Sequence, residues 1–236
     1  MTIQTSPQGP ATADANAGMV HPLAGAFDEL YDAGLRSAEM PDNARRRPRF
    51  YNLAQVFNLS RPVPGETAEV GCFRGLSSFL ICHLVKRSAP HFTGATHSVV
   101  DSFEGLGPPS EEDELPPDVE GRFSTTSVEH VRRTLAEFPD VRIYQGWVPG
   151  VFLALPERRY RFVHVDVDLY EPTRDSLEYF YPRLHRGGMI VVDDFGPWPG
   201  GGKYPGCSKA VLEFCEPRGL EVAALTTGNA VIVKPR

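Results

Sequence analysis

Four aspartates follow two short apolar runs of the chain, and their types and spacing are suited to metal-assisted chemistry. Asp166 and Asp168 follow the first run, and Asp193 and Asp194 follow the second. Short apolar runs closed by turn residues are typical of buried parallel strands. In an open α/β sheet, ligands bind outside the carboxyl ends of such strands. Crowded carboxylates repel one another unless a cation neutralises them, so the pattern indicates a hard divalent metal held by oxygen ligands.

We assign Asp166, Asp193 and Asp194 to the metal, with Mg²⁺ as the candidate ion, and Asp168 to proton transfer. Asp166 and Asp193 are 27 residues apart (193 − 166), enough for one helix and a returning strand. Asp168 lies two residues beyond Asp166, so a slight bend lets it face the same crevice as a general base. His164 shares a strand face with Asp166, where it is either a core histidine or a support for the ligand. Helix capping is the alternative role for these aspartates, and it explains one of them more easily than four.

A glycine-bearing turn, from Glu69 to Gly75, is the candidate cofactor site. Gly71 would let the backbone pass close to a ligand, and Gly75 would permit tight packing of a helix on a strand. The middle glycine of the dinucleotide-binding pattern is missing, so a pyrophosphate fits poorly, whereas Glu69 suits a cofactor with a cationic head. Asp101 ends the next strand, where it can accept hydrogen bonds from ribose hydroxyls, and we add the adjacent Ser102 to the cofactor set. An ordinary turn between strand and helix is the alternative.

Alternating strand and helix signals position these residues. The predicted strands are 67–70, 96–100, 141–144, 161–165, 189–192, 220–226 and 230–233, and the predicted helices between them are 76–85, 129–138, 172 to the glycines at 187–188, and 208–216. This alternation predicts a Rossmann-like α/β fold with a seven-stranded, mostly parallel sheet and helices on both faces. The last two strands have no helix between them, which predicts an antiparallel C-terminal strand.

The chain divides into three parts by composition. Residues 1–20 have almost no large apolar side chains, so we expect a disordered tail. Residues 21–65 carry two helical patterns and predict an N-terminal helical layer that covers a site or pairs subunits. Residues 66–236 then form the catalytic domain. Within it, the proline-rich and acidic residues 102–127 predict either a functional lid or a disordered insertion, with the acidic part solvated. The glycine-rich residues 196–206 predict a mobile wall above the metal.

Composition excludes several classes of protein. The net charge of −6 argues against a nucleic-acid-binding protein, and the basic run from Arg45 to Arg49 is typical of a solvated helix end or a local anion contact. The four cysteines form no CxxC pair, which argues against a zinc site or disulfides and fits a reducing cytosol. No apolar run is long enough to span a bilayer, and the N-terminus lacks the pattern of a secretory signal. We therefore expect a cytoplasmic protein without a membrane partner.

Taken together, these residues resemble the class I S-adenosylmethionine-dependent methyltransferases. More narrowly, they resemble the TylF/MycF/NovP family of sugar O-methyltransferases that act on macrolides and aminocoumarins. The resemblance extends from about Arg45 to Arg236, and its matching stretches are 69–75, 100–105, 164–173, 192–194 and 208–214. It implies that Asp166, Asp193 and Asp194 bind Mg²⁺, that Asp168 is the base, and that the turn and Asp101 hold S-adenosylmethionine.

The resemblance also implies a substrate and an assembly. Transfer of a methyl group to a sugar hydroxyl of a glycosylated small molecule, in antibiotic biosynthesis, is the implied reaction. The implied assembly is a homodimer or a larger homo-oligomer that associates through its N-terminal helices. The chain departs from the family pattern at residues 108–118, which are more acidic and proline-rich, and at residues 195–206, which are longer and richer in glycine. Both departures concern segments that could line the acceptor site.

Other functions use only part of this pattern. An NAD(P)-dependent oxidoreductase would require the full glycine pattern, which is missing. A metal-dependent hydrolase would use the aspartates but leave the Glu69–Gly75 turn and Asp101 without a role. A methyltransferase acting on a small non-sugar acceptor would use every site residue. A binding protein with a decayed site is disfavoured, because buried like charges without a ligand cost roughly several kcal/mol.

Overall fold

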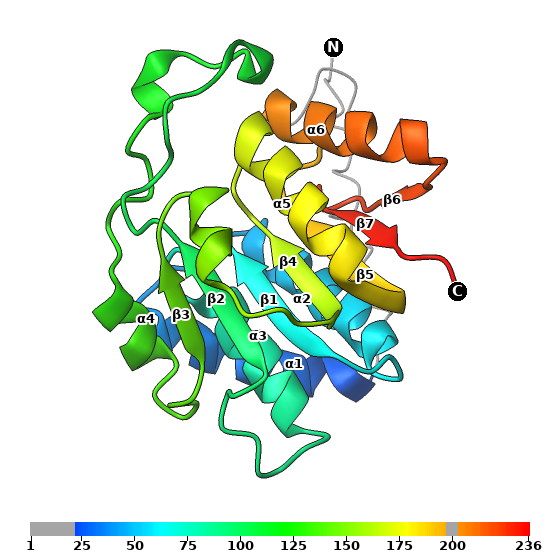
Figure 1. Cartoon of the computed structure of the whole chain (residues 1–236). Helices are drawn as coiled ribbons and strands as arrows, with labels where there is room; N and C mark the ends of the chain where they lie inside the picture. Colours follow the sequence, from blue (N-terminus) through cyan, green and yellow to red (C-terminus); the bar gives the residue numbers. More distant parts are fainter. Residues whose placement is uncertain (1–21, 197–202) are drawn as a thin grey trace, which may run out of the picture.

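The sheet of this protein has the number of strands and the strand directions that the sequence predicts. The computed structural model describes residues 22–196 and 203–236, so the predicted tail and most of the predicted glycine-rich wall lie outside the described residues. Within this part of the chain, seven strands form one sheet in the order β3-β2-β1-β4-β5-β7-β6 (Figure 1). They are β1 Glu66–Val70, β2 His97–Asp101, β3 Arg142–Gln145, β4 Tyr160–Val165, β5 Leu184–Val192, β6 Val222–Ala224 and β7 Ala230–Val233. Strand β7 runs antiparallel to both of its neighbours, and the other pairings are parallel.

The register of the central strands aligns the predicted site residues. Val70 at the end of β1 is level with Val100 of β2 and with Val165 of β4, and Val165 is level with Val192 of β5. The residues that follow these valines are Gly71, Asp101, Asp166 and Asp193. The chain order reverses between β1 and β4, and such a switch point leaves a crevice at the carboxyl ends of the strands.

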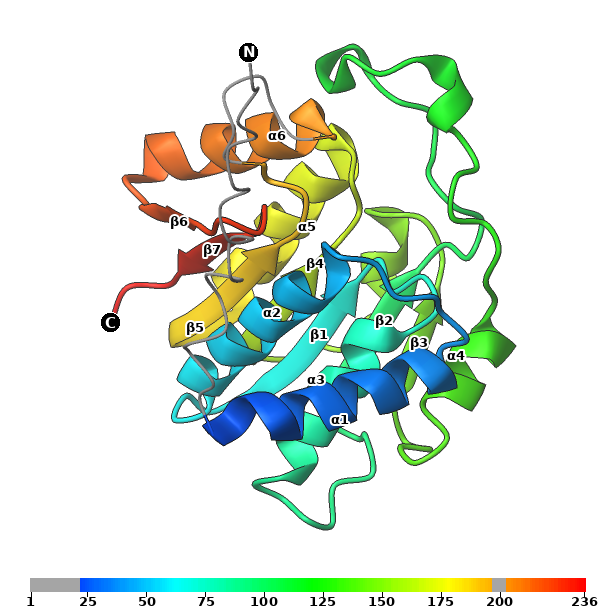
Figure 2. The ribbon, with the colours of Figure 1, turned by 180° about the vertical axis from the view of Figure 1, so that it is seen from behind.

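Helices cover both faces of the sheet. They are α1 Pro22–Ser37, α2 Arg46–Ser60, α3 Leu76–Lys86, α4 Val128–Thr134, α5 Tyr170–Arg183 and α6 Pro205–Cys215. Figures 1 and 2 show α5 and α6 on one face and α1, α2 and α3 on the other. No helix of the described residues is both long enough and apolar enough to cross a membrane.

The two N-terminal helices share a hydrophobic core with the sheet. Phe27 and Tyr31 of α1 and Phe57 of α2 are buried in the same cluster as side chains of α3 and of the central strands. The rings of Phe57 and of Phe162 in β4 meet edge to face, with centroids 5.3 Å apart. The predicted helical layer is therefore continuous with the sheet-bearing domain, and its role in pairing subunits stays a prediction.

The predicted end of the helix before β5 is wrong. We expected the helix before β5 to continue to Gly187 and Gly188, but α5 ends at Arg183 and both glycines lie within β5. Pro182 lies next to this end, and a proline in the last turn removes a backbone donor and favours termination. The glycines instead pair with the chain that follows β7. The backbone N–H of Gly187 donates to the Lys234 carbonyl, and the backbone N–H of Lys234 donates to the Gly188 carbonyl.

Two predicted elements are shorter in the structure. Helix α4 ends at Thr134 rather than at Phe138, and tight turns follow it that still bury Phe138 in the core. Pro139 disfavours a helical conformation at the residue before it, which accounts for the early end. Strand β6 covers three of the seven residues expected at 220–226.

Residues 102–127, which we call the arch, contact the rest of the domain at several points, and one of these contacts is made by a buried aspartate. The arch contains two short 3₁₀ turns, η1 Glu111–Asp113 and η2 Pro117–Val119. Asp113 is 1% exposed, and its Oδ1 accepts the first N–H of α5, from Tyr170, at 2.7 Å. Contrary to our prediction, the acidic run is therefore not simply solvated, because one of its carboxylates caps a helix. Figure 1 shows the arch (green) reaching beyond the sheet edge.

Candidate active site

A cavity of about 560 Å³ opens at the carboxyl ends of β1, β2, β4 and β5. Seven of the nine predicted site residues line it, namely Gly71, Asp101, Ser102, Asp166, Asp168, Asp193 and Asp194. The other two, Glu69 and Gly75, do not. The cavity also reaches the start of α2, the base of the arch and Trp147. It therefore joins the candidate cofactor turn to the candidate metal ligands.

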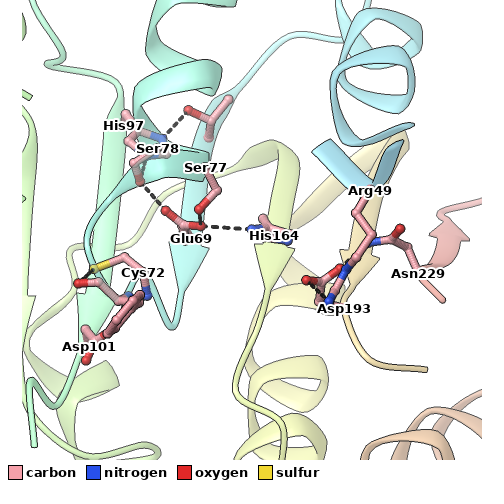
Figure 3. Close-up of polar contacts among 12 residues, drawn as sticks. Arg49, Glu69, Cys72, Ser77, Ser78, His97, Asp101, His164, Asp193 and Asn229 are labelled. Carbon is pink, nitrogen blue, oxygen red and sulfur yellow. Dashed lines mark hydrogen bonds and ion pairs between the residues drawn. The ribbon is translucent and has the colours of Figure 1, made fainter. Parts of the chain in front are cut away.

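The turn after β1 has a conformation that requires glycine at its first position. Gly71 has a φ of +79°, and a Cβ atom there would lie 1.9 Å from the Asp166 carbonyl oxygen. Asp101 holds the same turn, because its Oδ2 accepts the N–H groups of Cys72 and Phe73 at 2.7 and 3.0 Å (Figure 3). Its Oδ1 accepts the N–H of Phe103 at 2.7 Å. A carboxylate has about four acceptor positions, so Asp101 keeps capacity for a ligand hydroxyl.

The structure corrects the role expected for Glu69. Its side chain is fully buried, and its two carboxylate oxygens accept the hydroxyls of Ser77 and Ser78 (Figure 3). His164 Nδ1 lies 2.9 Å from Oε1 of the same carboxylate. Glu69 therefore fixes the first turn of α3 to β1 and β4, beneath the cavity. Sequence reasoning missed this because the local pattern does not show that the Glu69 side chain points to α3 and does not line the cavity.

Glu69 and His164 form a buried ion pair. Burial disfavours the charge of Glu69, but the hydrogen bond from His164 and the charge of that ring lower the pKa of the carboxyl. Burial also opposes the charge of His164, yet its bond to Glu69 raises the pKa of the imidazole to about 9. A ring nitrogen of His164 lies within 4.8 Å of a carboxylate oxygen of Asp166 and of Asp193, and its role in supporting a metal ligand stays a prediction.

Gly75 has a packing position in the structure. It precedes α3 with a φ of +83°, and a Cβ atom there would lie 3.3 Å from Cγ1 of Val131 in α4. The tight packing predicted for Gly75 is therefore present, although the partner is a helix rather than a strand. Its contribution to cofactor binding stays a prediction.

The carboxylates after β4 and β5 gather in one cluster. Asp166, Asp168 and Asp194 each offer an oxygen within 4.8 Å of the others, and His164, Asp166 and Asp193 form a second such group. Burial and the charges of Asp193 and Asp194 raise the pKa of Asp166 well above its usual range. Burial and the charges of Asp194 and Asp166 do the same for the pKa of Asp168. Such a set of hard oxygen donors fits Mg²⁺, which would relieve their mutual repulsion.

Two of these aspartates have a left-handed backbone. The φ angles of Asp168 and Asp194 are +59° and +55°. Asp168 is the centre of a tight turn in which Leu169 N–H donates to the Val167 carbonyl at 2.6 Å. Non-glycine residues rarely adopt this conformation, and it is concentrated at functional sites. The bend expected at Asp168 is present, and its role as base stays a prediction.

Arg49 and Asn229 belong to the site but were not among the predicted residues. The Arg49 guanidinium donates to the Asp193 carboxylate, and its Nη2 lies 3.3 Å from Asp194 Oδ2. Asn229 donates to the other oxygen of Asp193. The sequence offered a local anion contact as one explanation of the basic run at 45–49, and this contact is present at Arg49. Nothing in the local pattern indicates that its partner lies 144 residues away.

Aromatic side chains stand at the mouth of the cavity. Phe123 of the arch and Trp147 after β3 line it and remain 42% and 45% exposed. Lys203 lies over the Phe123 ring, 5.5 Å from its centroid. Exposed rings beside a polar floor can pack on the apolar face of an organic ligand.

Comparison with known proteins identifies the family of this chain. Residues 44–228 match the family described as Macrocin-O-methyltransferase (TylF). The chain belongs to this family. A similar curated relative is 8-demethyl-8-(2,3-dimethoxy-alpha-L-rhamnosyl)-tetracenomycin-C 4'-O-methyltransferase of Streptomyces olivaceus, which is 32% identical over 147 residues. Another is demethyldecarbamoylnovobiocin O-methyltransferase of Streptomyces niveus, 32% identical over 178 residues.

These alignments cover 58% and 70% of this TylF-family chain, and 55% and 64% of the two relatives. The chain therefore spans less than two thirds of the curated relatives that it matches. The solved structure of the O-methyltransferase NovP has a TM-score of 0.72 and 23% identity, covering 90% of this chain and 99% of that one. The fold is thus that of the class I methyltransferases, as the resemblance implies.

Proposed function

We propose that this protein is an Mg²⁺-dependent O-methyltransferase that transfers a methyl group from S-adenosylmethionine to a sugar hydroxyl of a glycosylated natural product. One observation carries the proposal: a single cavity joins the turn at Gly71 and Asp101 to the carboxylates of Asp166, Asp168 and Asp194. Membership of the TylF family supports methyl transfer over the oxidoreductase and hydrolase alternatives. The rhamnosyl group in the name of one relative supports a sugar acceptor.

The cofactor half of the site acts through backbone shape and one carboxylate. Gly71 leaves open the space in which any side chain would collide with the Asp166 carbonyl. Asp101 keeps the turn in this shape through its three hydrogen bonds from backbone N–H groups, and it can accept a ribose hydroxyl at its remaining position. Ser102 lines the same wall. S-adenosylmethionine, when bound, supplies a methyl group on a cationic sulfur.

The acceptor half acts through the aspartates. Asp166, Asp193 and Asp194 would hold Mg²⁺, and the ion would lower the pKa of a hydroxyl and orient it. Asp168 would accept the hydroxyl proton as the general base. Transfer would form a bond between the acceptor oxygen and the methyl carbon and break the carbon–sulfur bond, with S-adenosylhomocysteine as the leaving group. Holding both reactants in one cavity supplies much of the rate by proximity.

The acceptor is proposed to bind between the aromatic mouth and the carboxylate floor. Phe123 and Trp147 offer ring faces to a sugar or an aglycone, and the aspartates meet the hydroxyl that reacts. A small non-sugar acceptor would use the same floor without filling the mouth. The size of the acceptor therefore separates these two substrate classes.

Calorimetry and product analysis test the proposal in two steps. S-adenosylmethionine is titrated into the full chain with Mg²⁺ and then with EDTA, and micromolar binding is expected in both conditions. Release of S-adenosylhomocysteine is then measured with glycosylated acceptors and with the matching aglycones. We expect turnover only with the glycosylated compounds and only with Mg²⁺. Absence of S-adenosylmethionine binding in either buffer would contradict the proposal.

A further inference from the structure

Arg49 is the part of the site that the proposed function leaves without a role. It lies in the first turn of α2 and extends from the helix to the Asp193 carboxylate (Figure 3). Its side chain is 27% exposed, and the side chains of Asp193 and Asp194 are 7% and 18% exposed. A cation is therefore already present on one side of the carboxylate cluster.

The neighbouring Arg47 shows that this contact is unlike an ordinary surface ion pair. The Arg47 guanidinium binds Asp28, Asp32 and Asp42 at 2.6 to 3.2 Å, and these three carboxylates are 37–50% exposed. Those contacts join α1, α2 and the loop between them at the surface. Arg49, in contrast, lines the cavity. Its charge is balanced by the carboxylates that are the candidate metal ligands.

Asp193 has both carboxylate oxygens engaged. Oδ2 accepts a hydrogen bond from Arg49, and Oδ1 accepts one from Asn229. A divalent cation on Oδ2 would lie within a few ångströms of the guanidinium, and like charges at such a distance repel strongly where water is scarce. An arginine side chain does not lose its proton in proteins, so the repulsion is relieved only if the side chain withdraws. The cavity that Arg49 lines provides the space for this.

We propose that Arg49 is the internal counter-cation of the carboxylate cluster and competes with the divalent metal for Asp193. The inference rests on the metal part of the proposed function and adds a positioning residue from α2. Arg49 holds the aspartates together in the metal-free protein, and the metal takes Asp193 only when Arg49 leaves. The position of the Arg49 side chain, and with it the start of α2, is thereby coupled to metal binding.

The test is the Mg²⁺ affinity of three variants, measured by calorimetry with MgCl₂ on the full chain. Arg49→Gln removes the competing charge, and we expect it to bind Mg²⁺ about tenfold more tightly than the wild type. Arg49→Lys keeps the charge, so its affinity should stay near that of the wild type. Arg45→Gln is the matched control, because Arg45 lines the cavity but has no ion pair among the described residues. Its affinity should change less than about threefold.

The outcomes separate this inference from the proposed function. Equal or weaker Mg²⁺ binding by Arg49→Gln overturns the competition, even if the wild type is an active methyltransferase. If neither the wild type nor any variant binds Mg²⁺, both the competition and the metal part of the proposed function are overturned. The cofactor part is tested separately, by binding of S-adenosylmethionine in EDTA. If Arg49→Gln does not fold, the test is the NMR signal of the Arg49 Nε–H group in the wild type. It should change on adding Mg²⁺, and an unchanged signal overturns the inference.

Discussion

At the scale of single residues, the site depends on side chains and backbone angles at the ends of four strands. Asp168 and Asp194 have left-handed backbone angles, and so do Phe73 and Phe103, which follow β1 and β2. Each of these residues bends the chain directly after its strand. A conformation of this kind costs of order 1–3 kcal/mol for a residue with a side chain. Three of these residues, Phe73, Asp168 and Asp194, line the cavity, so their bends shape its wall.

Replacing Asp168 by asparagine tests the proposed base. The amide keeps the size of the side chain but does not accept the hydroxyl proton, so we expect turnover to fall by about 10²–10⁴-fold. Binding of S-adenosylmethionine should be unchanged. Release of S-adenosylhomocysteine and calorimetry measure the two effects. Asp175→Asn is the control, because Asp175 lines the same cavity but binds Arg174 rather than the cluster.

Two results would change this assignment. Normal turnover of Asp168→Asn would rule out Asp168 as the base. A large loss of Mg²⁺ affinity in the same variant would assign Asp168 to the metal instead, which its closeness to Asp166 and Asp194 permits. The matching test of a proposed ligand is Asp193→Ala, which should lose the dependence of turnover on Mg²⁺.

Replacing Gly71 by alanine tests the close approach of β1 and β4 beneath the cofactor site. The new methyl group would lie 1.9 Å from the Asp166 carbonyl oxygen, so the two backbones must separate. We expect the free energy of unfolding to fall by about 3 kcal/mol and S-adenosylmethionine binding to be lost. Gly150→Ala should stay within about 0.5 kcal/mol of the wild type, since a Cβ at Gly150 meets nothing within 4 Å. Urea unfolding compares the two, and equal effects would contradict the packing argument.

At the scale of elements, the arch is held by the N-terminus of a helix. Asp113 accepts the first N–H of α5, where a negative charge is also favoured by the helix dipole. Gly206 of α6 leaves room for it, because a Cβ atom there would lie 2.0 Å from Asp113 Oδ1. One aspartate thus joins α5, α6 and a long irregular segment whose base lines the cavity.

Removing this cap should release the arch. Asp113→Ala loses the bond to the Tyr170 N–H, so we expect the free energy of unfolding to fall by about 1–2 kcal/mol. Trypsin should then cleave after Arg122 faster than in the wild type. Glu111→Ala is the control, since Glu111 lies two residues earlier and is exposed. Equal cleavage rates of the two variants would show that Asp113 does not hold the arch.

At the scale of the whole molecule, a buried polar network links strands, a helix and the pH dependence of stability. Glu69 is bonded to His164 on β4 and to Ser78 on α3, and Ser78 is bonded to Nε2 of His97 on β2 (Figure 3). Nδ1 of His97 lies 2.8 Å from the Thr67 hydroxyl. Each of these side chains is buried, so the protonation states of the glutamate and the two histidines contribute to the stability of the entire sheet.

His97 should make the protein less stable in mild acid. Burial lowers the pKa of His97 from 6.5 to about 4. Between these values the unfolded chain binds a proton that the folded chain does not, so stability rises with pH and is lost as the pH falls. The slope from this group approaches about 1.4 kcal/mol per pH unit. His164 acts in the opposite sense, because its pKa is raised from 6.5 to about 9 in the folded protein. Its stabilising contribution is present below pH 6.5 and is lost as the pH rises through about 9.

Urea unfolding at pH 7.0 and pH 5.5 measures this contribution. The loss of stability between the two should be smaller in His97→Gln than in the wild type, although the variant is less stable overall. His91→Gln is the control, since His91 is exposed. A His97→Gln variant with the wild-type difference would show that another group causes the acid sensitivity.

The sequence by itself determined the sheet and most of the residues at its carboxyl edge. Apolar runs closed by Gly71, Asp101, Asp166 and Asp193 are local signals, and strands in parallel register bring such residues to one level. The predicted helix ends were less accurate, as α5 shows, because Gly187 and Gly188 serve a strand and not a helix cap. The periodicity of apolar residues and the types of the turn residues were therefore enough to predict most helices and strands and the residues at the floor of the cavity.

Only the tertiary structure decided which distant side chains meet that floor. Arg49 and Asn229 reach Asp193 across 144 and 36 residues, and Glu69 turns away from the cavity toward α3. No local pattern encodes such contacts. A buried carboxylate is satisfied by whichever donor the packing of the helices brings within reach, and that depends on the whole fold.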